Sequence, residues 1–491
     1  MLQHLTPRAL VLLLVFVPVF VPLAGARTLP PSLPASLPTE VASHLDAFVL
    51  ERMAAWATPG LSLVVVLEGE VVLSRGYGVA DLVTGEPMSE DTLVMLGSTT
   101  KAMTALAVMQ LAEAGKLELD APVTRYLPWF GVADPRGADI TLRHLLSHSS
   151  GFPWGTLFTG REQQEELAAY VRSLAGVRLE AAPGERYGYS NDTFTILGLI
   201  VQEVAGVPYE SYMQDNVFGP LGMTRTTFDM ALAERRGLAA GHRNEYGAAA
   251  PYSLPYTDSE NPAGKLMTSS SDLGNYLIML LGGGVFRGTR VLSERSLAEM
   301  WTPVVPADDG LSYGLAWYLG DFGDFGATGF VTHPGSTGTS GSRFTLVPGA
   351  GLGVGVISNV SRPSDPREEI TWSITLATLL FGDAPFEAPP TPEPVPLMID
   401  PAVRAALVGE YGSAAGPVRI FEEGDRLLGS VAGYDFALEP MSDSLFVLRS
   451  DAERLDGLTL EFLPANPRAQ DWLAGDDRLA LMGQWFAFRS E

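Results

Sequence analysis

Residues 97–116 read GSTTKAMTALAVMQLAEAGK, and in a helix begun at Ser98 apolar side chains would fall on nearly every face. A helix that is apolar all round is enclosed by other elements, so the segment predicts a buried helix that ends near Gly115. Lys101 lies inside this helix, although it is one of only three lysines in a chain that carries 29 arginines. A lysine kept here, where arginine is used almost everywhere else, indicates that the amine itself is needed.

Ser98 and Lys101 are three residues apart and share a face of the predicted helix, with the hydroxyl at its N-terminus. A hydroxyl nucleophile needs a nearby base, and burial together with the positive end of a helix lowers the pKa of a lysine. Arginine could not serve, because its guanidinium keeps its proton in proteins. Alone the Ser-x-x-Lys spacing is a weak signal, since chance supplies it in roughly one of five chains with ordinary serine usage and three lysines.

Two later motifs strengthen the interpretation. Tyr189-Ser190-Asn191 offers a phenol and an amide, and a stretch that reads HPGS (333–336) follows much later. The three motifs, in this order, resemble those of the serine β-lactamase and penicillin-binding protein superfamily, closest to its class C-like branch. Four longer stretches also look like that family: ITLRHLLSHSSGF (140–152), PGERYGYSNDTFTILGLIVQEVAGVPYESY (183–212), PLGMTRTTF (220–228) and PAGKLMTSSSDLGNYLIMLLGGG (262–284). The resemblance covers about residues 40–381.

The resemblance implies an α/β fold, a three-layer α-β-α sandwich with an antiparallel sheet and a helical insertion lobe, and a site between the sheet and the lobe. Local patterns predict matching elements: an amphipathic helix from about residue 45, β-hairpins over 61–79 and 344–358, and a closing helix over 367–381.

The resemblance also implies roles for the matching residues. Ser98 would be the acylated nucleophile, Lys101 would take its proton, and Tyr189 would share the proton transfer. The backbone N–H groups of Ser98 and Ser336 would form the oxyanion hole, where fixed donors stabilise developing negative charge. Asn191 would hold the lysine or a substrate amide. Neither a cofactor nor a metal is expected.

One departure from the family pattern bears on the substrate. Where β-lactamases and transpeptidases carry Lys-Thr-Gly, this chain has His333-Pro334-Gly335, which we expect to contribute to substrate binding through His333 and Gly335. Histidine is mostly neutral at pH 7, and proline offers neither a hydroxyl nor an N–H, so recognition of a substrate carboxylate should be weakened. The change is similar to that in some family VIII-type esterases and D-aminopeptidases.

We therefore expect a serine hydrolase, an esterase or peptidase, that acts on a small-molecule or peptide ester or amide. A class C-like β-lactamase or D,D-carboxypeptidase is the alternative within the family. The alternative of another class is a slow acyl-ligand binding or sensing protein. The intact set of Ser98, Lys101 and Tyr189 argues against it, because a binding protein needs no base beside its serine.

Composition, local patterns and the family resemblance together predict five segments: a signal peptide (1–26), a linker (27–39), the hydrolase domain (40–382), a proline-rich linker (383–401) and a C-terminal β-barrel of lipocalin-like kind (402–491). Arg8, an apolar run and Ala24-Gly25-Ala26 are typical of a cleaved secretory signal, so a secreted or periplasmic protein is expected, with cleavage after Ala26. Pro18 and Pro22 disfavour an uncleaved anchor.

Net charge and cysteine content limit the classes of partner and covalent link that can be expected. The chain carries a formal net charge of −25, and removal of Arg8 with the signal would make it −26. Such a surface repels nucleic acid and anionic membranes. The absence of cysteine excludes disulfides and a lipid anchor on cysteine. His144 and His148 are four residues apart, but no third ligand lies at a zinc-type spacing, so structural roles are favoured over a metal site.

Overall fold

The computed structural model describes residues 39–361 with gaps at 56, 154–165, 246–247, 254–256, 308–309 and 321–328. In the C-terminal part it describes residues 401–412, 418–424, 426–431, 434–440, 445–449, 459–464, 478–482 and 485–489.

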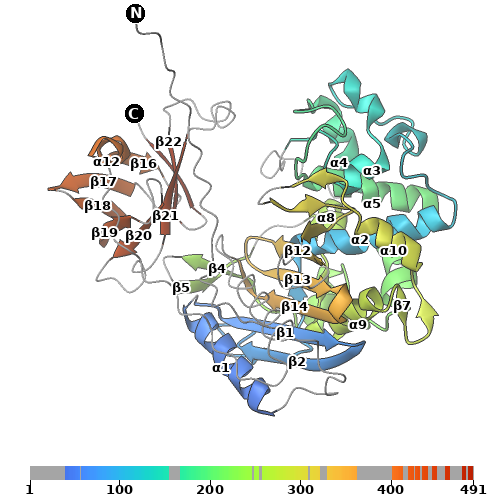
Figure 1. Ribbon diagram of the computed structural model, residues 1–491, viewed down its shortest axis with the longest axis horizontal. Helices are drawn as coiled ribbons and strands as arrows, with labels where there is room; N and C mark the ends of the chain where they lie inside the picture. The colour runs from blue at the N-terminus through green and yellow to red at the C-terminus, as the bar shows by residue number, and fades with distance from the viewer. Residues whose placement is uncertain are drawn as a thin grey trace, which may run out of the picture. The chain divides into compact units, whose positions relative to one another are not determined.

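An eight-stranded antiparallel sheet forms the centre of the N-terminal part, in the order β2-β1-β14-β13-β12-β11-β10-β9 (Figure 1). The strands are β1 (Gly60–Leu67), β2 (Glu70–Gly78), β9 (Val305–Pro306), β10 (Ser312–Tyr313), β11 (Tyr318–Gly320), β12 (Phe330–Ser336), β13 (Gly341–Val347) and β14 (Leu352–Ser358). Because β1 comes first and β14 last but they pair, the two ends of this part meet in the middle of one sheet.

Helices cover both faces of the sheet at its β1–β2 edge. Helix α9 (Ser270–Leu281) lies on one face, where the Ser74 hydroxyl of β2 is 3.4 Å from that of Ser270. Helix α1 (Thr39–Ala55) lies on the other, where Tyr77 of β2 donates a 2.8 Å hydrogen bond to Asp46. Alternate residues of β2 thus contact different layers, as the two-residue period of a strand requires.

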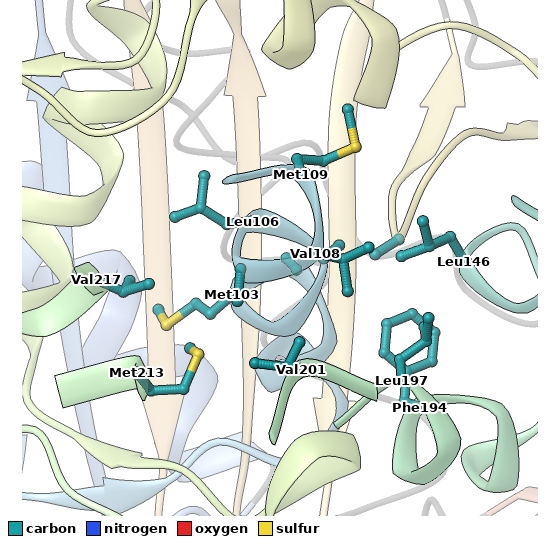
Figure 2. Packing of buried hydrophobic residues seen from close by; sticks show 14 of the residues in the cluster. Met103, Leu106, Val108, Met109, Leu146, Phe194, Leu197, Val201, Met213 and Val217 are labelled. Atoms are coloured by element: carbon teal, nitrogen blue, oxygen red, sulfur yellow. The ribbon is translucent and has the colours of Figure 1, made fainter. Parts of the chain in front are cut away.

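A lobe of short helices surrounds α2 (Thr100–Glu113), whose side chains are buried on all sides from Thr100 to Met109. Figure 2 shows Met103 of α2 directed toward Met213 and Val217, with Leu146 on another side of the same helix. The described helices of the lobe are α3 (Leu142–Leu146), α4 (Leu167–Ser173), α5 (Asn191–Ala205), α6 (Tyr209–Met213), α7 (Met230–Arg235), α8 (Asn261–Gly264) and α10 (Glu294–Met300).

Three smaller sheets complete this part of the chain. They are β3 (Val94–Met95) with β6 (Met267–Thr268), β7 (Val285–Phe286) with β8 (Thr289–Arg290), and β15 (Val360–Ser361) with β4 (His242–Glu245) and β5 (Ala248–Pro251). The β3–β6 pair brings the chain just before Ser98 beside the chain just after α8, which places two distant stretches at one site.

The C-terminal part forms a closed eight-stranded barrel in which β23 pairs with β16. Its strands are β16 (Gly409–Gly412), β17 (Val418–Glu423), β18 (Arg426–Val431), β19 (Tyr434–Pro440), β20 (Leu445–Arg449), β21 (Thr459–Pro464), β22 (Arg478–Met482) and β23 (Trp485–Arg489). A short helix, α12 (Pro401–Leu407), precedes them. Closure leaves no unpaired edge strand.

The α/β class, the antiparallel sheet with its helical lobe, both hairpins and the barrel confirm the expected fold. The predicted helix at Ser98 begins two residues later, because residues Gly97–Thr99 form a 3₁₀ turn. Helix α12 was not expected at the start of the barrel segment. The predicted signal peptide, the closing helix at 367–381 and the proline-rich segment before Pro401 lie outside the described residues.

Candidate active site

Ser98 occupies the centre of the 3₁₀ turn Gly97–Thr99, which leads directly into α2. Its side chain is half-buried, whereas both of its neighbours are buried. Ser342 of β13 holds the turn in place. Its hydroxyl donates a 2.7 Å hydrogen bond to Leu96 O and lies 2.5 Å from the Thr99 hydroxyl. The serine is therefore presented at the surface of a rigidly held turn.

Two glycines let the turn approach the end of β12. Gly97 has φ +68°, and a Cβ there would lie 2.4 Å from Ser336 N. A Cβ on Gly335 would lie 2.2 Å from Leu96 O. Only glycine permits so close a backbone approach. The contact brings the exposed Ser336, at the end of β12, next to the peptide that precedes Ser98, where an oxyanion hole formed by these two residues would require it.

Lys101 lies one turn into α2 and is completely buried. Its Nζ is 3.0 Å from Ser98 Oγ, 2.7 Å from Asn191 Oδ1 and 2.6 Å from Ala263 O. Burial lowers the pKa of Lys101 well below its ordinary value, although Glu260 acts in the opposite direction. A neutral amine can donate two hydrogen bonds, to Asn191 and Ala263, and direct its lone pair at the Ser98 hydroxyl.

Tyr189 lies just before α5, with its phenol beside the Ser98 hydroxyl. Burial raises the pKa of its phenol above the ordinary value, and the nearby Ser98 hydroxyl lowers this pKa by a smaller amount. The Tyr189 ring also lies over the amine of Lys101, with 5.0 Å between Nζ and the ring centroid. A protonated phenol and a neutral amine therefore flank the same hydroxyl.

Asn191 is the first residue of α5, so the Tyr-Ser-Asn motif spans the entry to that helix. Helix α8 supplies the remaining contact of Lys101 through a backbone carbonyl, that of Ala263. Residues from α2, α5 and α8 thus converge on one amine.

His333 is fully buried near Tyr189, with 6.5 Å between the centroids of the two rings. Its Nε2 is 3.0 Å from the Tyr313 hydroxyl, and its Nδ1 is 2.6 Å from Pro334 O. Because a carbonyl only accepts, Nδ1 carries the proton and Nε2 accepts from the phenol. Burial, with a smaller contribution from Lys101, lowers the pKa of His333 to about 3. The ring is neutral, and both nitrogens are used within the protein.

The structure thus brings together all seven residues selected from the sequence, with Gly335 in a backbone contact and His333 in the layer behind. Sequence reasoning missed the Ala263 carbonyl, because a backbone acceptor has no side-chain signature. It also assigned no part in the site to His148, whose ring centroid is 4.1 Å from that of Tyr189. His148 was considered only as one half of a metal-binding pair.

The fold and the serine–lysine pair are those of a serine hydrolase. A family profile described as Beta-lactamase matches residues 45–379, well over half of the chain, and the protein therefore belongs to the beta-lactamase family.

Several proteins are similar to it. Penicillin-binding protein 4 of Amycolatopsis lactamdurans is 34% identical over 319 residues, which cover 61% of this chain and 81% of the relative. Putative penicillin-binding protein PbpX of Bacillus subtilis is 30% identical over 258 residues, 52% of this chain and 61% of the relative. Protein flp of Staphylococcus aureus is 27% identical over 330 residues, which cover 66% of this chain and 64% of the relative. The match thus spans less than two thirds of the length of the last two relatives.

Among solved structures, the octameric penicillin-binding protein homologue from Pyrococcus abyssi has a TM-score of 0.62 at 24% identity. The match covers 91% of this chain and 99% of that one. At this level of identity the likeness concerns the fold alone.

Proposed function

We propose that the protein is a secreted serine hydrolase that cleaves an ester or amide through an acyl-enzyme on Ser98. The observation that carries the proposal is the 3.0 Å contact between the Ser98 hydroxyl and the Nζ of a fully buried Lys101. A buried amine with a lowered pKa is a base at neutral pH, and it lies within the distance at which a general base acts.

In the first half-reaction, Lys101 takes the Ser98 proton as the Ser98 oxygen bonds to the substrate carbonyl carbon. The tetrahedral oxyanion receives hydrogen bonds from the N–H groups of Ser98 and Ser336. As the bond to the leaving group breaks, the proton passes from the Lys101 ammonium through the Tyr189 hydroxyl to the leaving oxygen or nitrogen. Water then attacks the acyl-enzyme and gives up a proton to the same base, which passes that proton to the Ser98 oxygen as the bond to the acyl group breaks, so that the acid is released and Ser98 and Lys101 are restored.

The surroundings of His333 favour an ester or peptide over a β-lactam. A substrate carboxylate would need a cation, and this ring is neutral with its pKa near 3. Lys101 already has three hydrogen-bond partners within the protein. Pro334 provides neither hydroxyl nor N–H at the next position. An anionic group bound against this ring would lose hydration without gaining a charge partner in His333.

The second candidate is a β-lactamase or D,D-carboxypeptidase, which the similarity to two relatives named as penicillin-binding proteins favours. A penicillin would then acylate the same serine. In the third candidate, a binding or sensing protein, acylation would occur with turnover too slow to matter.

The proposal includes export, because residues 1–26 are predicted to be a signal peptide. The enzyme would then encounter its substrates outside the cytoplasm. Within the described part of the chain, every helix is too short or too polar to cross a bilayer. Edman sequencing of the exported protein should begin at Arg27. Retention of residues 1–26 would contradict cleavage of the signal.

Ser98→Ala tests the proposal directly. Hydrolysis of p-nitrophenyl acetate should fall by a factor on the order of 10⁶, as for loss of a serine nucleophile elsewhere. Ser211→Ala is a matched control, because Ser211 is exposed on α6. Both variants should melt close to the wild type. Equal ester turnover by Ser98→Ala and wild type would sink the proposal.

A further inference from the structure

A fully buried histidine contacts three successive residues of the segment that carries Tyr189 and Asn191. His148 follows α3 and is 0% exposed. We propose that His148 is a positioning residue, which fixes the Tyr189 phenol against Ser98 and the Asn191 amide against Lys101. This inference rests on the proposed function and adds a residue to its machinery.

The contacts come from the backbone and the side chain of His148 alike. The carbonyl oxygen of His148 accepts a 2.7 Å hydrogen bond from Gly188 N. Its ring lies against that of Tyr189, with 4.1 Å between centroids and 39° between planes. Its Nδ1 accepts from Ser190 N at 3.2 Å. The side chain and the backbone carbonyl of His148 therefore contact residues 188, 189 and 190 in turn.

These bonds fix the protonation state of the ring. Because Ser190 N–H donates to Nδ1, that nitrogen must keep its lone pair, and the proton lies on Nε2. Nε2 has no hydrogen-bond partner among the described residues, and the rings of Phe194 and Tyr313 each lie 5.2 Å away by centroid. Burial, then Lys101, lowers the pKa of His148 well below its ordinary value. The ring is a neutral acceptor set among aromatic rings.

The backbone of His148 is also unusual. Its φ is +52°, in the left-handed region that residues other than glycine seldom adopt. Such a conformation persists where the surroundings hold it, and it occurs most often at functional sites. Histidine and asparagine tolerate it better than most residues do. The chain turns sharply here, directly beside the segment that the residue contacts.

A displacement of that segment would disturb both sides of the reacting pair. The Tyr189 phenol lies beside the Ser98 hydroxyl, and Asn191 Oδ1 is 2.7 Å from Lys101 Nζ. Catalysis by positioned groups is sensitive to displacements of about 1 Å, which can lower a rate by about 10²-fold. Loss of His148 should therefore slow acylation and leave substrate binding little changed, since His148 lies behind Tyr189.

Three variants separate the two kinds of contact. His148→Ala removes the ring and the acceptor, His148→Asn restores an acceptor that suits a positive φ, and His148→Phe restores only the ring. We expect the acylation rate constant with p-nitrophenyl acetate, measured by stopped flow, to fall by about 10- to 100-fold in His148→Ala, with KM within about threefold. The other two variants should each recover part of the loss.

His144→Asn is the matched control. His144 belongs to α3, and its Nδ1 also accepts a backbone N–H at 3.2 Å, that of Thr141. The control should lower the melting temperature and leave the acylation rate of the folded enzyme unchanged. If the His148 variants lose stability in the same way but acylate at the wild-type rate, His148 is only structural and the proposal is wrong.

Crystal structures of the three variants test the positioning role of His148 independently of turnover. The proposal expects the Tyr189 ring to move and the contact between Asn191 Oδ1 and Lys101 Nζ, 2.7 Å in the wild type, to lengthen beyond hydrogen-bond distance in His148→Ala. Unchanged positions would overturn it. A wild-type protein that forms no adduct on Ser98 would instead contradict the proposed function, and the crystal structures would still decide the role of His148.

Discussion

At the scale of single residues, the environment of Lys101 explains why a lysine is retained in the most enclosed helix of the lobe. Its three hydrogen-bond partners are all uncharged, and burial opposes a positive charge on the amine. Arginine would stay charged in the same place. The rarity of lysine in this chain is therefore consistent with selection of a group that can release its proton.

The first prediction concerns pH. The neutral amine of Lys101 is the active form, so kcat/KM should fall as pH drops through the lowered pKa and should be constant above it. The fall should therefore occur well below the pH at which an ordinary lysine titrates. The measurement is kcat/KM for an uncharged ester between about pH 5 and about pH 10.

Lys101→Arg should lower kcat by between about 10²- and 10⁴-fold at every pH, because the guanidinium cannot act as a base. Lys116→Arg, on an exposed residue after α2, should leave the profile unchanged. If kcat/KM of Lys101→Arg still falls at low pH as in the wild type, the titrating group is a residue other than Lys101.

The second prediction concerns His333. His333→Lys places an amine where the family usually has one, and an unpaired buried cation gains most from an anionic partner. The ratio of kcat/KM for a peptide acid to that for its amide should rise about tenfold or more, and the melting temperature should fall. His333→Gln, which stays neutral, is the control and should leave the ratio unchanged. An unchanged ratio in folded His333→Lys would show that this position does not face the substrate carboxylate.

Residue type and spacing indicated Ser98 and Lys101, and the resemblance to the family supplied the other five of the seven residues that meet at the site. Neither was enough to show that both nitrogens of His333 are bonded within the protein, which depends on Tyr313, twenty residues earlier in sequence. His148 was missed because stacking and acceptance from a backbone N–H leave no sequence pattern.

At the scale of elements, the junction between the Gly97–Thr99 turn and β12 decides the geometry. The apolar pattern of residues 97–116 predicts α2, and the β-branched runs predict the hairpins. The 3₁₀ turn before α2 could not be predicted, because it depends on contacts with β12 and β13, more than 200 residues away in sequence. Gly335 was selected as a substrate-binding residue, and the structure gives it a close backbone approach.

The third prediction follows from that approach. Gly335→Ala would place a Cβ 2.2 Å from Leu96 O and 3.0 Å from Thr99 N, so the turn must move away from β12. The free energy of unfolding should fall by about 1–3 kcal/mol, as in other overpacked sites. The kcat should fall as well, because the N–H groups of Ser98 and Ser336 separate.

Urea unfolding and ester kinetics measure the two effects. Gly131→Ala is the matched control, since a Cβ at that exposed glycine meets nothing within 4 Å. Wild-type kcat in Gly335→Ala, together with wild-type stability, would refute the role of this junction.

At the scale of the whole molecule, the closed barrel is the feature that extends beyond the family match, which ends at residue 379. Short strands separated by turn residues predict an all-β unit, and seven prolines between 385 and 401 predict the boundary before it. The barrel was predicted, but the register in which its first and last strands pair was not, because that pairing joins residues far apart in the sequence.

The fourth prediction is that the barrel shapes access to the site. A chain that ends at Pro390 should still be acylated on Ser98, because every residue of the site precedes this point. Its preference between small esters and peptide substrates should change. Relative kcat/KM values for p-nitrophenyl acetate and a set of peptide amides measure this preference. Identical preferences in the truncated and full-length proteins would remove the role.

The most direct measurement is intact-mass spectrometry of the mature protein after exposure to a p-nitrophenyl ester and, separately, to a penicillin, with peptide mapping of any adduct. We expect an acyl adduct on Ser98 with the ester, release of p-nitrophenol over many turnovers, and little hydrolysis of the penicillin. Rapid penicillin hydrolysis would contradict the preference argued from His333. Absence of an adduct with either reagent would contradict the central claim that Ser98 is an acylated nucleophile.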